Sequence, residues 1–124
     1  MKKKWKPPTW EDLIHHIDRY HDLRRYIGKA PKRLRPALAA ALAVAKWHPD
    51  REANLGKGYC GLCALYRHHP EQDCCCCPLR KRTNRTCFES GSLFLRAFNS
   101  QLMKTKPLFT VLCEIYAEEW EKLK

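Results

Sequence analysis

The chain has 124 residues, with 24 Lys and Arg against 13 Asp and Glu, so its formal net charge at pH 7 is +11. This length is typical of one domain, and we expect residues 1–124 to form a single domain. Hydrophobic residues make up 44% of the chain, which excludes a wholly disordered protein. The apolar run at residues 37–45 is far shorter than the ~20 residues that span a bilayer, so we expect no membrane partner.

The first elements in chain order are a basic arm and two helices. Residues 1–8 are rich in Lys and Pro and predict a flexible basic arm. Apolar residues then recur near helical spacing and predict a first helix, which opens at Thr9 and stops in a left-handed conformation at Gly28. Pro36 suits the first turn of a second helix, which ends at residues 48–50. The apolar face of this second helix is expected to comprise Leu34, Leu38, Ala41, Leu42 and Ala45.

The rest of the chain predicts an insert and two more helices. Residues 51–90 contain glycines, cysteines and polar residues without periodicity, and predict an irregular, cysteine-rich, metal-binding insert. Helical spacing returns at Ser92 in a short amphipathic helix, and Lys106 and Pro107 open a last helix. The apolar stripe of the last helix is expected to comprise Leu108, Val111, Leu112, Ile115, Tyr116 and Leu123. The sequence therefore predicts a mainly α fold, with about four helices around one core.

Eight cysteines indicate either disulfides in an oxidising compartment or a metal site in a reducing one. Residues 74–77 are four consecutive cysteines, and neighbouring cysteines rarely meet disulfide geometry with one another. The basic arm is followed by Glu11 and Asp12, where an export signal would need an apolar stretch. We therefore expect a soluble protein in a reducing cytoplasm.

The spacing of the cysteines predicts one structural Zn²⁺. Two Cys-x-x-Cys pairs are separated by ten residues, and two such pairs can turn four sulfurs toward one tetrahedral ion. The expected ligands are Cys60, Cys63, Cys74 and Cys77. We expect Gly61 to give the first turn its backbone freedom and Pro78 to keep the residue before it extended. Cys87 is an alternative fourth ligand in place of Cys74.

Other uses of the cysteines remain open. An iron–sulfur cluster and a dithiol redox switch are the alternatives to zinc. We interpret Cys75 and Cys76 as bystanders and Cys113 as a buried free thiol on the last helix. No His-Glu-x-x-His pattern is present to serve a catalytic zinc, so we expect the protein not to be an enzyme.

The order of these features is similar to that of a known group. The alanine-rich helix that ends at Trp47 is followed by a Cys-Gly-Leu-Cys motif, then Cys-Pro-Leu, a further cysteine and a closing amphipathic helix that ends at Trp120. This order resembles small, mostly uncharacterised tailed-phage proteins with a Cys-x-x-Cys, Cys-x-x-Cys-Pro, Cys pattern. The resemblance covers residues 37–124 and maps onto Cys60, Cys63, Cys74, Cys77 and Cys87. It implies a phage-encoded protein in the host cytoplasm, and it implies no particular activity.

The positive charges gather in two places besides the basic arm. One group surrounds the junction of the first two helices and includes Arg24, Arg25 and Lys29, and the other lies between Cys77 and Cys87. If these groups share a face, they can contact a phosphate backbone. The candidate nucleic-acid-binding residues are Lys32, Arg33, Arg35, Arg80, Lys81, Arg82 and Arg85.

The charge favours a binding protein for nucleic acid or a nucleoprotein complex. No sequence-specific DNA-binding motif is present, so we expect any nucleic-acid binding to be salt-sensitive and weakly selective. The alternative is a phage accessory protein that docks on a host defence or transcription protein and inhibits it. A basic surface that serves solubility alone also fits the composition.

Overall fold

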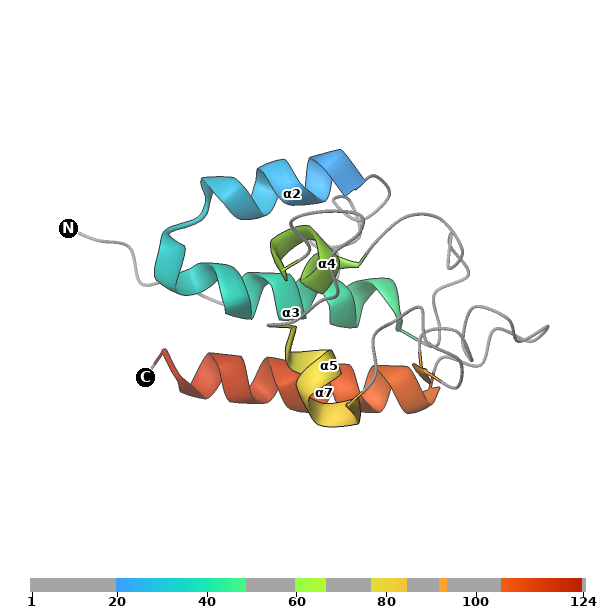
Figure 1. The fold of residues 1–124 in the computed structure, drawn as a ribbon. Helices are drawn as coiled ribbons and strands as arrows, with labels where there is room; N and C mark the ends of the chain where they lie inside the picture. The colour runs from blue at the N-terminus through green and yellow to red at the C-terminus, as the bar shows by residue number, and fades with distance from the viewer. Residues whose placement is uncertain (1–19, 49–59, 67–76, 85–91, 94–105, 124) are drawn as a thin grey trace.

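The computed structural model of the chain describes residues 20–48, 60–66, 77–84, 92–93 and 106–123. All regular structure in these residues is helical, which confirms the predicted mainly α fold. Figure 1 shows the helices. They are α2 (Tyr20–Lys29), the short 3₁₀ helix η1 (Lys32–Leu34), α3 (Arg35–Lys46), α4 (Gly61–Tyr66), α5 (Pro78–Thr83) and α7 (Lys106–Glu121). Within the described residues, every helix is too short or too polar to cross a membrane.

The helix α3 is the centre of the arrangement. It lies between α2 and α4 on one side and α7 on the other, and α5 lies against α7 (Figure 1). The sequence predicted α3 with Pro36 in its first turn, but the helix ends at Lys46, before the predicted end at residues 48–50. The prediction of a single apolar face was wrong, because Ala37, Ala39, Ala40 and Ala43 on the other sides of the helix are also buried. A helix that is apolar all round is a buried helix.

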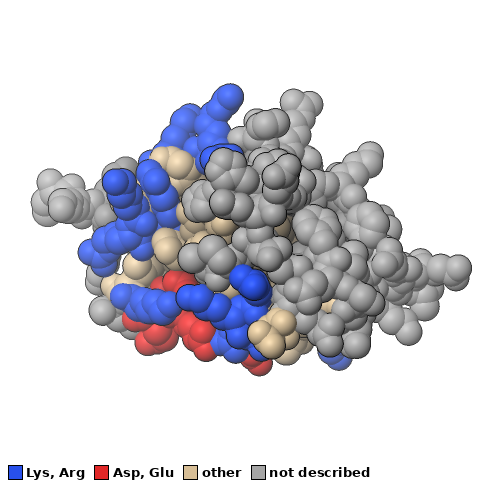
Figure 2. Space-filling view, viewed as in Figure 1, with Lys and Arg blue, Asp and Glu red and all other residues tan. Residues whose placement is uncertain are grey.

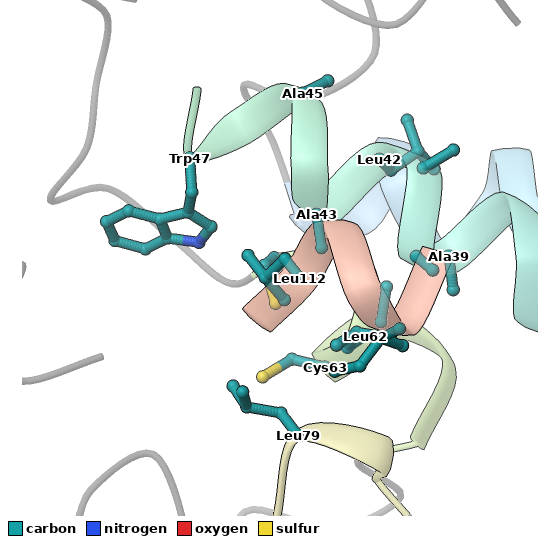
Figure 3. Close-up of a cluster of buried hydrophobic side chains, with 14 of the residues drawn as sticks. Ala39, Leu42, Ala43, Ala45, Trp47, Leu62, Cys63, Leu79 and Leu112 are labelled. Atoms are coloured by element: carbon teal, nitrogen blue, oxygen red, sulfur yellow. The ribbon is translucent and has the colours of Figure 1, made fainter. Parts of the chain in front are cut away.

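The core joins leucine and isoleucine side chains from α2, α4, α5 and α7 to the alanines of α3. Figure 3 shows Leu62 of α4 and Leu112 of α7 close to this helix, and Leu79 of α5 beside Cys63 in the same cluster. Complete burial of one such side chain stabilises the fold by about 2 kcal/mol. The largest fully buried side chains are Leu23, Ile27, Leu42, Trp47, Leu62, Leu108, Leu112 and Ile115.

Gly61 is fixed by close packing between two helices. A Cβ atom at this position would lie 2.3 Å from the carbonyl oxygen of Ala39 and 2.8 Å from Cβ of Leu42. Both distances are far below van der Waals contact, so only glycine allows α4 to approach α3 this closely. The prediction that Gly61 serves a flexible turn was wrong, since Gly61 is part of α4.

Two further predictions were wrong in the described residues. The insert at residues 51–90 is not irregular where it is described, because it contains α4 and α5. Gly28 does not stop the first helix in a left-handed conformation, since α2 continues to Lys29 and the backbone of Gly28 is not in that region. The basic arm, the opening of the first helix and nearly all of the helix expected after Ser92 lie outside the described residues.

Candidate metal centre and basic surface

Cys60 and Cys63 form a buried pair of thiols at the start of α4. Cys60 directly precedes the helix, and its carbonyl oxygen accepts a hydrogen bond of 3.1 Å from the N–H of Ala64. Cys63 lies in the first turn, so the two side chains share one side of the chain. Each cysteine is only 5% exposed. In Figure 3 the Cys63 side chain lies next to Leu79 of α5.

Hydrogen bonds to the sulfur of Cys60 stabilise its thiolate. The thiol of Cys63 donates to this sulfur and is the main reason why the pKa of Cys60 is lowered from 9.0 to about 6. Burial opposes this shift, while the backbone N–H groups of Cys63 and Leu62 and the charge of Lys46 add to it. A thiolate is the form of cysteine that binds metal ions and reacts as a nucleophile.

Lys46 supplies a buried positive charge beside this pair. It lies in the last turn of α3 and is only 3% exposed. A lysine ammonium is almost never this deeply buried unless a partner compensates its charge. The attraction between Lys46 and Cys60 therefore gives both groups a favourable partner. The sequence analysis did not identify Lys46. Its position on the alanine-rich helix does not indicate that the thiols at the start of α4 lie beside it in the fold.

Cys77 has the local conformation that the sequence predicted. Its φ of −67° and ψ of 128° are extended, and Pro78 follows it in the first turn of α5. The side chain is 2% exposed. Among the described residues, however, no three His, Cys, Asp or Glu side chains come close enough together to hold a metal ion.

The remaining metal ligands of the prediction, Cys74 and the alternative Cys87, lie outside the described residues, as do Cys75 and Cys76. The donor chemistry of the described pair fits Zn²⁺, since two adjacent sulfurs with one favoured thiolate are half of a four-sulfur site. Cys113 of α7 is half-buried rather than buried as predicted, and burial raises the pKa of its thiol.

Arg82 connects α5 to α7 at the surface of the protein. Its Nη1 donates to Oε2 of Glu114 at 3.1 Å, and its Nη2 donates to Oε1 of Glu118. The side chain of Arg82 is 28% exposed. Of its predicted neighbours, Lys81 is exposed and Arg80 is half-buried, whereas Arg85 lies outside the described residues. Glu114 and Glu118 therefore bind the guanidinium group that the sequence analysis assigned to nucleic-acid binding.

Arg35 also has a structural role. Its Nε donates to the carbonyl oxygen of Ala30 at 3.0 Å, and its Nη2 donates to that of Gly28 at 2.7 Å. The guanidinium therefore satisfies carbonyl groups at the carboxyl end of α2, where a positive charge is favourable. Arg33, by contrast, makes one long contact of 3.3 Å to the carbonyl oxygen of Leu123 and is exposed, as is Lys32.

An exposed cationic surface covers α2 and its connection to α3. We call it the junction surface, and it consists of Arg24, Arg25, Lys29, Lys32 and Arg33. Leu23 and Ile27 turn the opposite side of α2 into the core. The segment 23–35 contains no Asp or Glu. Figure 2 shows Lys and Arg gathered over α2 and the connection, a further group of Lys and Arg over α5, and acidic side chains next to that group over α7.

The helix α7 carries the acidic side chains that the structure describes. Glu114, Glu118 and Glu121 are exposed, while Glu119 is only 8% exposed and accepts a bond of 2.9 Å from Nζ of Lys122. Sequence reasoning missed Glu119, although it lies four residues after Ile115 on the predicted apolar stripe. The negative charges of α7 lie beside α5, so they weaken the positive field around Arg80 and Lys81.

These features define a small, basic, helical protein with a buried thiol pair and a separate cationic surface. Comparison with known protein families, curated proteins and solved structures gave no match. Its function is therefore inferred from the side chains of this chain.

Proposed function

We propose that the chain is a small, non-enzymatic, zinc-stabilised protein that binds the phosphate backbone of nucleic acid through the junction surface. The observation that carries this proposal is the concentration of exposed cations on α2 and its connection, in a segment without a single acidic residue. Lys and Arg that neutralise phosphates release counterions, which drives binding without reading the base sequence.

The structure changes which residues we assign to this binding. Arg82 and Arg35 have partners within the fold, so we assign the phosphate contacts to the junction surface rather than to α5. Arg24 and Arg25 enter the binding set, because they face away from the core and lie next to Lys29.

For the metal, we propose that Cys60 and Cys63 provide two of four ligands to one Zn²⁺. The other two ligands would be Cys77 and either Cys74 or Cys87. Zinc would supply a rigid cross-link between α4 and the segments that follow it. We propose a reducing compartment, because the four consecutive cysteines at residues 74–77 are poorly suited to disulfides with one another. The resemblance to tailed-phage proteins supports the host cytoplasm as that compartment.

The test compares two variants that lose the same charge at different places. In the first, Arg25, Lys29 and Lys32 of the junction surface are replaced by Gln. In the second, Arg80, Lys81 and Lys106 are replaced by Gln. The affinity of each variant for a fluorescent DNA duplex of arbitrary sequence is measured by anisotropy at several salt concentrations.

We expect the junction variant to bind at least about tenfold more weakly, with a salt slope reduced by up to about 0.9 for each lost phosphate contact. The matched variant should retain most of its affinity. Equal losses in the two variants would mean that net charge alone matters and would contradict the assignment to the junction surface. If the unchanged protein does not bind nucleic acid even at low salt, docking on a host protein becomes the better proposal.

A further inference from the structure

The connection between α2 and α3 carries two cations of the junction surface and is tied to α3 by Arg35. The chain turns back at this connection (Figure 1), where Lys29 ends α2, Lys32 begins η1 and Arg35 begins α3. The guanidinium of Arg35 reaches back across the turn. Its Nη2 donates to the carbonyl oxygen of Gly28 at 2.7 Å, and its Nε donates to that of Ala30 at 3.0 Å. These two bonds fix the backbone on both sides of Lys29.

We propose that Arg35 is a positioning residue for phosphate binding. It holds the backbone of the connection, so that Lys29 and Lys32 are already in place to bind phosphates of one nucleic acid, and it does not itself contact a phosphate. Because this role concerns the cations of the junction surface, it rests on the proposed function. Arg35 thereby supports the binding surface from the side of α3.

The end of α2 needs a partner from outside the helix. The last carbonyl groups of a helix have no acceptor role within it, and glycine at position 28 leaves the backbone its widest freedom. In the described part of the chain, nothing would lie within 4 Å of a Cβ atom at Gly28. The bonds from Arg35 therefore supply order that the local sequence does not.

The far end of the connection is already anchored. Leu34 is buried, and its N–H donates to the carbonyl oxygen of Pro31 at 2.9 Å. The ring of Pro31 also restricts its own backbone. With Leu34 in the core at one end and Arg35 bonded to Gly28 and Ala30 at the other, the exposed residues between them are held in one conformation.

The two bonds depend on the shape of the arginine side chain as well as on its charge. The guanidinium is planar, so Nε and Nη2 donate in fixed directions to two different carbonyl oxygens. A lysine ammonium is a compact charge on a flexible stem and lacks this fork. Arg35→Lys therefore removes the positioning and keeps the net charge of the chain.

The test compares Arg35→Lys with Arg82→Lys. Arg82 also bonds to two acceptors within the fold, but it lies on α5 and outside the junction surface. Both variants keep the net charge. Their affinities for a fluorescent DNA duplex are measured by anisotropy at several salt concentrations, and urea unfolding gives the stability of each variant.

We expect Arg35→Lys to bind about three- to tenfold more weakly, because side chains that must be ordered during binding reduce the affinity. The salt slope should stay unchanged, since the number of phosphate contacts is the same. Arg82→Lys should bind like the unchanged protein. An equal loss of affinity in Arg82→Lys would show that reduced stability alone weakens binding, and would overturn the proposal.

Arg35→Gln separates positioning from direct contact. If Arg35 bound a phosphate itself, Arg35→Gln would reduce the salt slope by about 0.9, and Arg35→Lys would keep most of the affinity, because lysine also binds phosphate. We expect both variants to bind weakly with the slope of the unchanged protein. A reduced slope in Arg35→Gln, or full affinity in Arg35→Lys, would overturn the proposal.

Hydrogen exchange examines the connection without nucleic acid. The N–H groups of Ala30 and Leu34 donate within it, to the carbonyl oxygens of Ile27 and Pro31. In Arg35→Lys, exchange at these two amides should become at least about tenfold faster than any change at α7. Unchanged exchange at both amides would show that Arg35 does not hold the connection, and the positioning role would fail.

The variant with Gln at positions 25, 29 and 32 distinguishes this role from the function on which it rests. If that variant binds weakly and Arg35→Lys binds fully, the positioning role alone fails. If that variant keeps the affinity of the unchanged protein, phosphate binding by the junction surface fails, and the role of Arg35 fails with it.

Discussion

Arg82 of α5 and Glu114 of α7 form an ion pair of 3.1 Å across two helices that are far apart in the sequence, and Glu118 binds the same guanidinium. The two acids are four residues apart, so they lie on one side of α7 and can both face Arg82. This contact holds α5, which follows Cys77, against the last helix.

The first prediction concerns this ion pair. Arg82→Gln should lower the free energy of unfolding by up to about 1 kcal/mol, because the carboxylates are more than half exposed and solvent screens them. The measurement is urea unfolding at low and at high salt, and the difference between the proteins should shrink at high salt. Lys81→Gln, on the exposed next position, is the matched control. A loss from Lys81→Gln as large as that from Arg82→Gln would contradict the assigned role of Arg82.

The second prediction contrasts two glycines. Gly61→Ala should destabilise the protein by about 2–3 kcal/mol, because the new methyl group meets the backbone oxygen of Ala39 and α4 must move off α3. Gly28→Ala should instead stabilise it by up to about 1 kcal/mol, since nothing lies within 4 Å and alanine favours a helix. Thermal unfolding of both variants checks the pair. If both substitutions act in the same direction, the close α3–α4 contact is wrong.

A third prediction follows from the proposed zinc site. Protein purified without added metal should contain about one zinc per chain by elemental analysis. Cys60→Ser and Cys63→Ser should each lose the metal and lower the melting temperature, whereas Cys75→Ser and Cys113→Ser should keep both. A chelator should lower the melting temperature of the unchanged protein. It should not lower that of Cys60→Ser or Cys63→Ser, which have already lost the metal. Equal metal loss from all four variants would exclude the proposed ligands.

The fourth prediction is a pH dependence of the zinc-free protein. The pKa of Cys60 is about 6 in the folded state and 9.0 ordinarily, so between pH 6 and 9 the unfolded chain binds one proton more than the folded chain. Because of this group, the free energy of unfolding increases with pH in this range, by at most about 1.4 kcal/mol per pH unit. This contribution is complete above pH 9 and is lost as the pH falls through 6.

Urea unfolding at several pH values checks this slope. Cys60→Ser should lack the contribution. Lys46→Met, which removes a buried charge and keeps the length of the side chain, should reduce the slope but not abolish it, because the hydrogen bond from Cys63 is the larger cause. Identical slopes in Cys60→Ser and the unchanged protein would show that the Cys60 thiolate does not stabilise the fold.

The sequence predicted best what depends on neighbours in the chain. Pro36 marked the first turn of α3 and Pro78 kept Cys77 extended, because proline restricts its own backbone and that of the residue before it. The Cys-x-x-Cys spacing likewise placed Cys60 and Cys63 together, because the two residues between them are too few to separate their side chains at the start of a helix.

What depends on distant segments could not be read from the sequence. The burial of Ala39 and Ala43 requires α4 and α7 on two sides of α3, and one apolar helix carries no sign of how many neighbours it will have. Arg82 looked available for phosphate until Glu114 and Glu118 were brought to it from more than thirty residues away. Cys60 and Lys46 likewise meet only in the folded chain.

The central position of α3 has a consequence for the order of unfolding. It contacts α4 on one side and α7 on the other, so detachment of either neighbour still leaves one side of α3 covered. The amide protons of α3 should therefore be the slowest to exchange with deuterium, and they should do so only when the whole chain opens.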